Sequence, residues 1–469
     1  MHTSTTSTVP LVSWTAAQLL EATQGYWLND QAPNTEIKRI LTDSRDAEAG
    51  DAFLALKGER FDAHAFITQV AEQGCQVAIV SQPIDAEICQ LVVPDTRLAL
   101  GQLGAYRRAQ NPQLKVIALT GSSGKTTTKE MLGSILSRIA PTLVTRGNLN
   151  NDLGVPVMLL ELCPEHQYAV MELGASHQGE IDYTSNLVQP LVAGIINIGT
   201  AHLGEFGGRD GICRAKSEIY AHIAPNGTAI VPAADDFADS IRQAVQTEQV
   251  LSFGAGGEIF ATEIELQAQS ATFKLNTPQG VRQVNLPFAG EHNVQNATAA
   301  AAFALAIGIS LDDIVLGLEQ AVGAKGRLNF IQQGRHLLID DTYNANPTSM
   351  RAAAEVLAQQ EGVRVMVMGD IGELGSSAVQ QHYMLGRDLV SVKGLNFVVA
   401  VGEFAPAAQE GARSTQYGKK MQAFLTQEQA LPFLLSLIET HQPQSMSFLF
   451  KGSRYTHMET LMADLMEKL

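Results

Sequence analysis

The 469-residue sequence is poor in cysteine, short of positive charge, and without a long apolar run suited to a membrane. Its four cysteines, Cys75, Cys89, Cys163 and Cys213, are too few and too scattered for a disulfide framework or a CxxC-type zinc site, so we expect a reducing compartment. Lysine and arginine number 32 against 48 acidic residues, and the net charge of −16 disfavours general binding to nucleic acid or anionic lipid. Backbone N–H groups and one or two cations can still hold a phosphate locally.

Two further absences indicate where the protein acts. The N-terminal segment has no cationic stretch followed by an apolar core, so we expect no secretory signal. The least polar segment, residues 294–311, is rich in alanine and contains Gln295, Asn296 and Thr298, which predicts a buried helix and not a membrane span. We therefore expect a soluble cytoplasmic protein without a membrane span.

The length predicts about three domains. We expect a small α/β domain over residues 1–110, before the strand that follows Asn111-Pro112. Continuous apolar runs predict a mainly parallel sheet covered on both faces over residues 111–324, and a second alternation of strands and helices predicts a Rossmann-like domain over residues 325–469. The fold class is therefore expected to be α/β. The apolar runs are residues 52–56, 77–80, 91–93, 116–119, 169–172, 192–198, 228–231, 336–339, 363–368, 397–401 and 447–450.

The strongest motif is TGSSGKTTT at residues 120–128, between an apolar strand and a helical stretch. This is the context that a phosphate-binding loop requires, with Lys125 to neutralise phosphate oxygens and Thr126 to bind Mg²⁺. The alternative is a tight turn with an exposed lysine. The glycine stands at Gly121, whereas the ordinary Walker pattern has it at position 119, which is Leu119 here. The residues expected at the nucleotide are Gly121, Ser122, Ser123, Gly124, Lys125, Thr126 and Thr127.

The shifted glycine begins a resemblance, because TGSSGKTTT resembles the loop of the Mur ligase family, the ATP-dependent amide-forming enzymes of peptidoglycan precursor synthesis. The resemblance extends through all three expected domains in chain order and implies ATP as the nucleotide. In FDAHAF, Ala63 stands where the family pattern often has glycine. The other matching segments are TDSR (42–45), FLALKGERFDAHAF (53–66), NLNNDLGVP (148–156), ELGAS (172–176), AKSEI (215–219), HNVQN (292–296), DDTYNANPTSM (340–350), MGDIGELG (368–375) and KGSR (451–454).

Three segments concern a metal site, namely ELGAS, AKSEI and NIGTAHLGEFG at residues 197–207. From the residues alone, Glu172 could be a solvated cap of its strand, His202 a structural histidine and Lys216 a surface lysine. The resemblance instead implies that Glu172 and His202 bind Mg²⁺ and that Lys216 is carbamylated, which turns a cation into an anionic oxygen ligand. It thus implies two Mg²⁺ ions, held by Thr126, Glu172, His202 and Lys216. The expected catalytic residues are Lys125, Glu172, His202 and Lys216.

Other segments concern ATP and the substrates. Asn293 and Asn296 could cap the following helix or contact the adenine, and the resemblance favours the adenine, with Asn296 as the stronger candidate. It also implies that Arg327 reaches the γ-phosphate as the third domain closes and that Asp341 lies at the ribose. Asn346-Pro347 additionally predicts a turn and a helix start. The substrate contacts that we expect are Ser44, Arg45, Lys57, Asn150, Asn151, Tyr343 and Asn344.

DDTYNANPTSM resembles the signature of the family member that adds D-alanyl-D-alanine to UDP-N-acetylmuramoyl-tripeptide through an acyl phosphate. We therefore expect this ligase activity, these two substrates, and a monomer that binds no nucleic acid. The alternatives are a sibling ligase that adds the third amino acid, a folate polyglutamylating ligase, and a phosphate-loop ATPase without ligase activity. The third domain lacks the sibling's Asp-Asn-Pro-Arg segment, and the TDSR and LKG segments argue against the folate enzyme.

Overall fold

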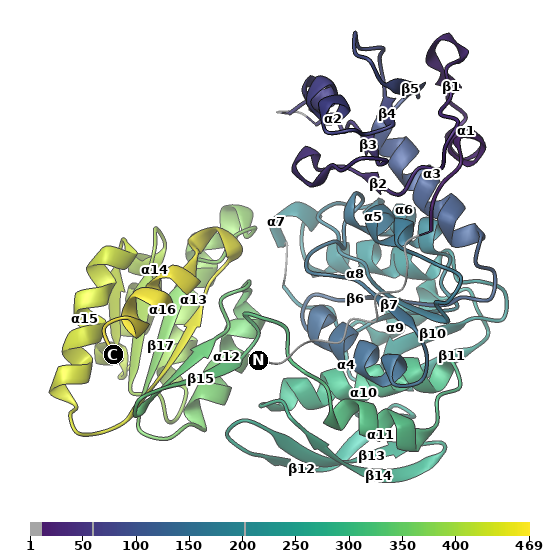
Figure 1. Cartoon of the computed structure of the whole chain (residues 1–469). Helices are drawn as coiled ribbons and strands as arrows, with labels where there is room; N and C mark the ends of the chain where they lie inside the picture. Colours follow the sequence, from purple (N-terminus) through teal and green to yellow (C-terminus); the bar gives the residue numbers. More distant parts are fainter. Residues whose placement is uncertain (1–11, 59–60, 201–202) are drawn as a thin grey trace.

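A computed structural model describes residues 12–58, 61–200 and 203–469 of the chain. Three helix-covered sheets follow one another along the sequence, which confirms the α/β prediction (Figure 1). In the view of Figure 1 the first domain lies at the top, the second below it and the third to the left. Within the described part of the chain, no helix is long and apolar enough to cross a membrane.

The first domain is built on a five-stranded sheet with the order β1-β5-β4-β3-β2, in which only β1 runs antiparallel to its neighbour. Helix α3 packs against α1 and also against α5 of the second domain, so it joins the two. The elements are α1 (Ala16–Thr23), β1 (Tyr26–Trp27), η1 (Leu28–Asp30), β2 (Ile40–Leu41), η2 (Ser44–Asp46), β3 (Ala52–Leu54), η3 (Ala63–Phe66), α2 (Ile67–Glu72), β4 (Val77–Val80), β5 (Cys89–Val92) and α3 (Thr96–Ala109).

The second domain has a six-stranded parallel sheet with the order β11-β10-β9-β6-β8-β7. Its strands are continuous apolar runs because helices cover both faces. The elements are β6 (Lys115–Thr120), α4 (Lys125–Ser137), β7 (Thr142–Val144), α5 (Gly154–Leu160), β8 (Tyr168–Glu172), α6 (Glu180–Val188), β9 (Val192–Ile195), α7 (Leu203–Phe206), α8 (Arg209–Ser217), η4 (Glu218–Tyr220), β10 (Thr228–Pro232), α9 (Ala238–Ala244) and β11 (Val250–Phe253).

The rest of the second domain departs from the sequence prediction in two ways. A three-stranded antiparallel sheet, β12 (Phe260–Leu266), β13 (Ala271–Thr277) and β14 (Gly280–Leu286), had no predicted counterpart. A buried helix does occupy most of residues 294–311, but the predicted C-terminal end of this helix is wrong. Helix α10 (Glu291–Ala306) stops before Gly308, which has a φ of +90°, and α11 (Leu311–Glu319) starts anew.

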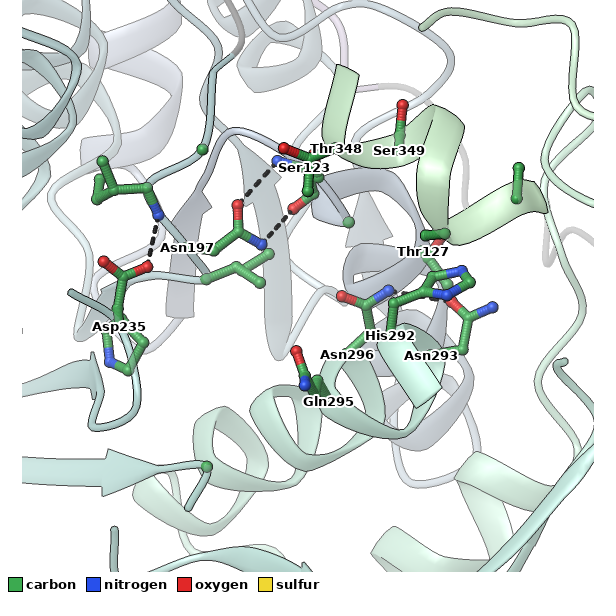
Figure 2. A pocket seen from close by; sticks show the side chains of 18 of the residues that line it. Ser123, Thr127, Asn197, Asp235, His292, Asn293, Gln295, Asn296, Thr348 and Ser349 are labelled. Carbon is green, nitrogen blue, oxygen red and sulfur yellow. Dashed lines mark hydrogen bonds between the residues drawn. The ribbon is translucent and has the colours of Figure 1, made fainter. Parts of the chain in front are cut away.

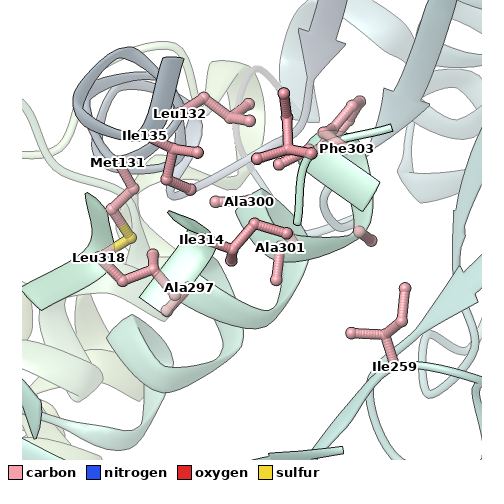
Figure 3. Close-up of a cluster of buried hydrophobic side chains, with 14 of the residues drawn as sticks. Met131, Leu132, Ile135, Ile259, Ala297, Ala300, Ala301, Phe303, Ile314 and Leu318 are labelled. Atoms are coloured by element: carbon pink, nitrogen blue, oxygen red, sulfur yellow. The ribbon is translucent and has the colours of Figure 1, made fainter. Parts of the chain in front are cut away.

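The alanines of α10 let two other helices come close. Ala297 and Ala299 to Ala302 have no exposed surface, and α4 and α11 pack around them (Figure 3). Where α4 and α11 meet, the Ser134 hydroxyl donates to the Gly317 carbonyl at 2.7 Å. A Cβ on Gly317 would stand only 2.5 Å from the backbone Cα of Ile135, so only glycine fits this crossing.

The third domain has the six-stranded sheet order β15-β16-β20-β17-β18-β19, parallel except for β15. Helices α12, α13 and α14 cover one face, and α15 and α16 cover the other. The elements are β15 (Asn329–Gln333), β16 (His336–Asp340), α12 (Pro347–Ala358), β17 (Val363–Gly369), η5 (Gly375–Ser377), α13 (Ala378–Ser391), β18 (Phe397–Val401), α14 (Ala405–Arg413), η6 (Gly418–Lys420), β19 (Met421–Phe424), α15 (Gln427–Thr440), β20 (Met446–Lys451), η7 (Arg454–Thr456) and α16 (Met458–Met466).

The α4–α11 crossing gives a stability prediction. Gly317→Ala should lower the free energy of unfolding by about 1–3 kcal/mol, because the new methyl group overlaps the Ile135 backbone, which cannot rotate away. This loss should outweigh the roughly 1 kcal/mol that alanine gains over glycine inside a helix. Urea unfolding measures the change. The control is Leu316→Ala at the exposed neighbouring position, expected within about 0.5 kcal/mol of wild type; a stabilised Gly317→Ala protein would contradict the packing argument.

Candidate functional site

The phosphate loop lies between β6 and α4, as the sequence predicts. Gly124 precedes the first residue of α4 and has a φ of +78°, a conformation that L-residues rarely adopt. The Asn296 side chain of α10 also packs against Gly124 so closely that a Cβ there would collide with its amide. The alternative interpretation, a tight turn with an exposed lysine, is wrong. Lys125 is only partly accessible, and its ammonium donates to the Gly121 carbonyl at 2.8 Å.

Asn197, in the loop that follows the neighbouring strand β9, holds the phosphate loop. Its Oδ1 accepts from the Ser123 N–H at 3.0 Å, and its Nδ2 donates to the Ser123 carbonyl at 3.0 Å (Figure 2). Its backbone carbonyl accepts from the Ser122 N–H at 3.1 Å. Sequence reasoning missed Asn197, and it took residues 192–198 as one strand. Strand β9 ends at Ile195, and the chain beyond it forms the loop that serves Ser122 and Ser123.

Glu172, the last residue of β8, is buried beside the phosphate loop. It is 1% exposed, so the interpretation as a solvated strand cap is wrong. Its Oε2 accepts from the Thr126 hydroxyl at 3.1 Å, and its Oε1 accepts from Asn150 Nδ2 at 2.8 Å. Three predicted site residues from different segments therefore form one hydrogen-bonded cluster.

Lys216, on α8, is 2% exposed, so the interpretation as a surface lysine is wrong. Burial, and then the positive charge of Lys125, lower the pKa of Lys216 well below its usual range, while the Glu172 carboxylate acts in the opposite direction. Burial also lowers the pKa of Lys125. The neutral amine of Lys216 is therefore favoured far more than in an ordinary lysine, next to the Thr126–Glu172–Asn150 cluster.

The donors at this place suit magnesium. Thr126 and Glu172 supply a hydroxyl and a carboxylate, and Mg²⁺ is usually bound by one or two carboxylates together with substrate phosphates and water. Among the described residues, no group of three or more His, Cys, Asp or Glu side chains could hold a metal ion by itself. His202, the further predicted ligand, lies outside the described residues.

A cavity of about 610 Å³ lies beside the phosphate loop, between the second and third domains. The loop after β9, together with residues of β11 and α10, lines one part of it, and residues of the third domain line another (Figure 2). Its size and mixed apolar and polar lining are typical of a small-ligand site. The predicted residues that line the cavity are Ser123, Gly124, Thr127, Asn293, Asn296, Arg327 and Asp341.

The two asparagines of HNVQN face this cavity from α10. Asn293 Nδ2 donates to the Ala289 carbonyl at 2.8 Å, and Asn296 Nδ2 donates to Asn293 Oδ1 at 3.0 Å (Figure 2). The N-cap of α10 is Gly290, without a side-chain hydrogen bond, so the capping interpretation is wrong. Burial lowers the pKa of the neighbouring His292 to about 4, and its imidazole is therefore neutral at pH 7.

Arg327 and Asp341 reach the cavity from the third domain. The Asp341 carboxylate forms a buried ion pair with Lys451 at 2.7 Å, and Lys451 also donates to the Asn344 carbonyl at 2.9 Å. The Arg327 guanidinium stacks 4.4 Å above the Tyr343 ring. Tyr343 and Asn344, predicted as substrate contacts, thus support cavity residues without lining the cavity themselves.

The side chain of Asn346 joins the third domain to the phosphate loop. Asn346 is the N-cap of α12, with Pro347 as first helical residue, which confirms the predicted turn and helix start. Its Nδ2 also donates to the Ser123 hydroxyl at 3.0 Å. Sequence reasoning did not select Asn346, although its place in NANP was a signal.

The remaining predicted substrate residues lie elsewhere. Ser44, Arg45 and Lys57 belong to the first domain, and none of them lines the cavity. Arg45 pairs with Asp43 beside it, and Lys57 lies 3.8 Å from Asp62. Asn151 Oδ1 accepts from the Gly154 N–H at 2.8 Å and so holds the start of α5.

Sequence comparisons match all three domains to one family. The matching models are described as Mur ligase family, catalytic domain (residues 36–118), Mur ligase middle domain (residues 119–304) and Mur ligase, glutamate ligase domain (residues 326–454). A relative in Escherichia coli (strain K12), UDP-N-acetylmuramoyl-tripeptide--D-alanyl-D-alanine ligase, is 41% identical over 97% of this chain and 99% of its own. Its namesake in Bacillus subtilis (strain 168) is 32% identical over 97% of this chain and 99% of its own.

Solved structures agree with these relatives. The structure of MurF from Acinetobacter baumannii is 76% identical, with a TM-score of 0.95 over 98% of this chain and 100% of that one. The structure of MurF ligase from Thermotoga maritima in complex with ADP is 26% identical, with a TM-score of 0.79 over 92% of this chain and 97% of that one.

The bonds of Asn197 predict an effect on nucleotide binding. Asn197→Ala removes both side-chain hydrogen bonds to Ser123, and at about 0.5–1.5 kcal/mol for each bond we expect ADP to bind about tenfold more weakly. Titration calorimetry with ADP and Mg²⁺ measures the change. The matched control is Asn285→Ala, which removes an exposed amide bonded to Glu319 and should leave ADP affinity unchanged. Equal affinities for the folded Asn197 variant and wild type would rule out the role of Asn197.

Proposed function

This chain belongs to the Mur ligase family, and on that premise we propose that it is the ATP-dependent ligase that joins D-alanyl-D-alanine to UDP-N-acetylmuramoyl-tripeptide. The product is the UDP-linked pentapeptide, and the step is the last cytoplasmic one in this nucleotide precursor's synthesis. The observation that carries the proposal is the buried cluster in which Glu172 accepts hydrogen bonds from Thr126 of the phosphate loop and from Asn150. This cluster supports the proposal because its carboxylate, hydroxyl and amide lie beside the phosphate loop, where a γ-phosphate and a second anion would meet.

The reaction has two steps. The terminal carboxylate of the tripeptide attacks the γ-phosphorus of ATP, so that ADP leaves and an acyl phosphate forms. The free amine of D-alanyl-D-alanine then attacks the acyl carbon, phosphate leaves, the amine loses a proton, and the amide remains. The first step is needed because a carboxylate repels nucleophiles and has no leaving group. Lys125 offsets the charge of the two anions that meet there, and burial of the site strengthens this effect.

Two Mg²⁺ ions would be held by Thr126, Glu172, His202 and Lys216, and they would neutralise phosphate charge. Lys216 would contribute as a carbamate, which forms when its neutral amine adds carbon dioxide and loses a proton. The lowered pKa of Lys216 supports this, because only the neutral amine reacts. Burial beside Glu172 supports it further, since a bound divalent cation would offset two neighbouring anions.

The cavity would hold the nucleoside part of ATP. Asn296, with Asn293 behind it, would contact the adenine, Asp341 the ribose and Arg327 the γ-phosphate. The common lining of one cavity by these four residues supports the assignment. Ser44, Arg45 and Lys57 in the first domain would hold the uridine diphosphate, with the domains divided at residues 110/111 and 324/325.

The two groups that become joined would be held by residues of the second and third domains. Asn150 and Asn151 would lie at the reacting end of the tripeptide, while Tyr343 and Asn344 would face D-alanyl-D-alanine. The hydrogen bond from Asn150 to Glu172 supports the first placement. The enzyme would act as a monomer in the cytoplasm, where its four free cysteines would stay reduced.

Substrate dependence tests the proposed reaction. Phosphate release from ATP and Mg²⁺ should require both UDP-N-acetylmuramoyl-tripeptide and D-alanyl-D-alanine, and mass spectrometry should find the pentapeptide. Release without either substrate would favour an ATPase instead, and release with a different amino acid would assign another ligation step.

Replacing Lys216 tests its proposed carbamate. Lys216→Ala should lower the turnover rate by at least about 100-fold, because an anionic magnesium ligand is lost. Bicarbonate should not restore activity, whereas a short-chain carboxylic acid should restore part of it. Lys274→Ala is the matched control, since Lys274 forms only an exposed ion pair with Glu263. Wild-type turnover in Lys216→Ala would exclude the carbamate role.

A further inference from the structure

Lys129 is a buried cation that the proposed reaction does not use. It lies on α4, three residues after Thr126, and is 1% exposed. Its ammonium donates to the Thr145 carbonyl at 2.7 Å and pairs with Glu130 at 2.6 Å. Burying an ammonium is unfavourable unless its partners are well placed, so these two contacts must compensate for the lost water.

Thr145 connects this cation to the backbone of Glu172. It follows the last residue of β7, and its own N–H donates to the Val170 carbonyl at 3.0 Å. Because β7 ends there, the Glu172 N–H has no strand carbonyl opposite it and donates to the Thr145 hydroxyl at 3.0 Å. The hydroxyl of one buried threonine therefore takes the place of the next ladder bond.

The contacts close a ring that includes the first turns of α4. Thr126 of α4 donates to the Glu172 carboxylate, the Glu172 N–H donates to Thr145, and Lys129 of the same helix donates to the Thr145 carbonyl. The segment after Thr145 leads to Asn150, which donates to the other Glu172 oxygen and accepts from the Gly174 N–H at 2.7 Å. Both partners of the Glu172 carboxylate are thus connected to α4: Thr126 belongs to it, and Asn150 follows the segment that Lys129 holds at Thr145.

We propose that Lys129 is a positioning residue that, through Thr145, fixes the Glu172 carboxylate relative to Thr126 and so sets the affinity of the magnesium site. The proposal rests on the proposed function for the identity of the metal and the reaction, but not for the hydrogen bonds. Lys129 does not line the cavity, and its ammonium contacts Thr145 and Glu130. Lys129 acts through its hydrogen bond to the Thr145 carbonyl, which fixes the position of Thr145. In that position the Thr145 hydroxyl accepts the hydrogen bond from the Glu172 N–H.

The test is Mn²⁺ binding to the complex of the enzyme with ADP, followed by electron paramagnetic resonance. Lys129→Met removes the ammonium at similar length, and Thr145→Val removes the hydroxyl at similar volume. Each should weaken Mn²⁺ binding about 10- to 100-fold, as loss of a residue that orients a metal ligand does. ADP affinity without metal should stay within about twofold, because the backbone of the phosphate loop is unchanged.

The two substitutions should not add, since they break the same chain of contacts. The double variant should bind Mn²⁺ with about the same affinity as whichever single variant binds it more weakly. Thr145→Ser keeps the hydroxyl and should retain most of the affinity. Ser134→Ala, on the same helix but bonded to Gly317 in the core, is the matched control and should leave Mn²⁺ binding unchanged.

Each result has one meaning. If Lys129→Met does not fold, Thr145→Val still tests the link, because it leaves the Lys129–Thr145 bond intact. Wild-type Mn²⁺ affinity in the folded Thr145→Val protein, or equal losses in Thr145→Val and Ser134→Ala, would overturn the proposal. If wild type forms no pentapeptide while the variants lose Mn²⁺ affinity as expected, the proposed reaction fails and the positioning role stands.

Discussion

The site depends on one feature of the sheet, the position of β6 between β8 and β9 with all three strands parallel. Parallel strands bring their carboxyl ends to one edge, and residues at or just after the ends of these strands contact one another there. The phosphate loop follows β6, Glu172 ends β8, and Asn197 follows β9. Asn197 holds the loop's backbone from one side, while Glu172 receives its Thr126 hydroxyl from the other. Neither contact could form if the strand order differed.

The same edge gathers more buried charge than an ordinary core tolerates. Lys129 and Lys216 are almost completely buried, and Lys125 and Glu172 lie next to them. The protein manages them in different ways. Lys129 has a carboxylate and a carbonyl as partners, whereas burial and the charge of Lys125 lower the pKa of Lys216 well below its usual range. Two buried lysines on the same edge therefore differ in their surroundings: Lys129 has an ion-pair partner, and the charged form of Lys216 is disfavoured.

The sequence allowed prediction of residues whose chemistry is local. The phosphate loop, Glu172, the strand runs and the helix start at Pro347 were all recognisable from adjacent residues, and the structure confirms these placements. Asn197 and Thr145 were not predictable, because their roles depend on which strand lies beside which. The sheet β12–β14 escaped prediction for another reason: one face of it meets solvent, and the β12 run carries no continuous apolar pattern.

This antiparallel sheet has a function in the architecture, because α12 contacts the second domain at both ends. At its start, the Asn346 amide donates to the Ser123 hydroxyl of the phosphate loop. Just beyond its end, the buried Gln360 amide donates to the Ala268 carbonyl in the turn between β12 and β13, at 2.6 Å. Two contacts separated by the length of a helix restrict rotation more than one contact does. The third domain therefore meets the cavity in a defined orientation, and Arg327 and Asp341 share that orientation because the Lys451 ion pair and the Leu328 N–H hold Asp341 to the same sheet.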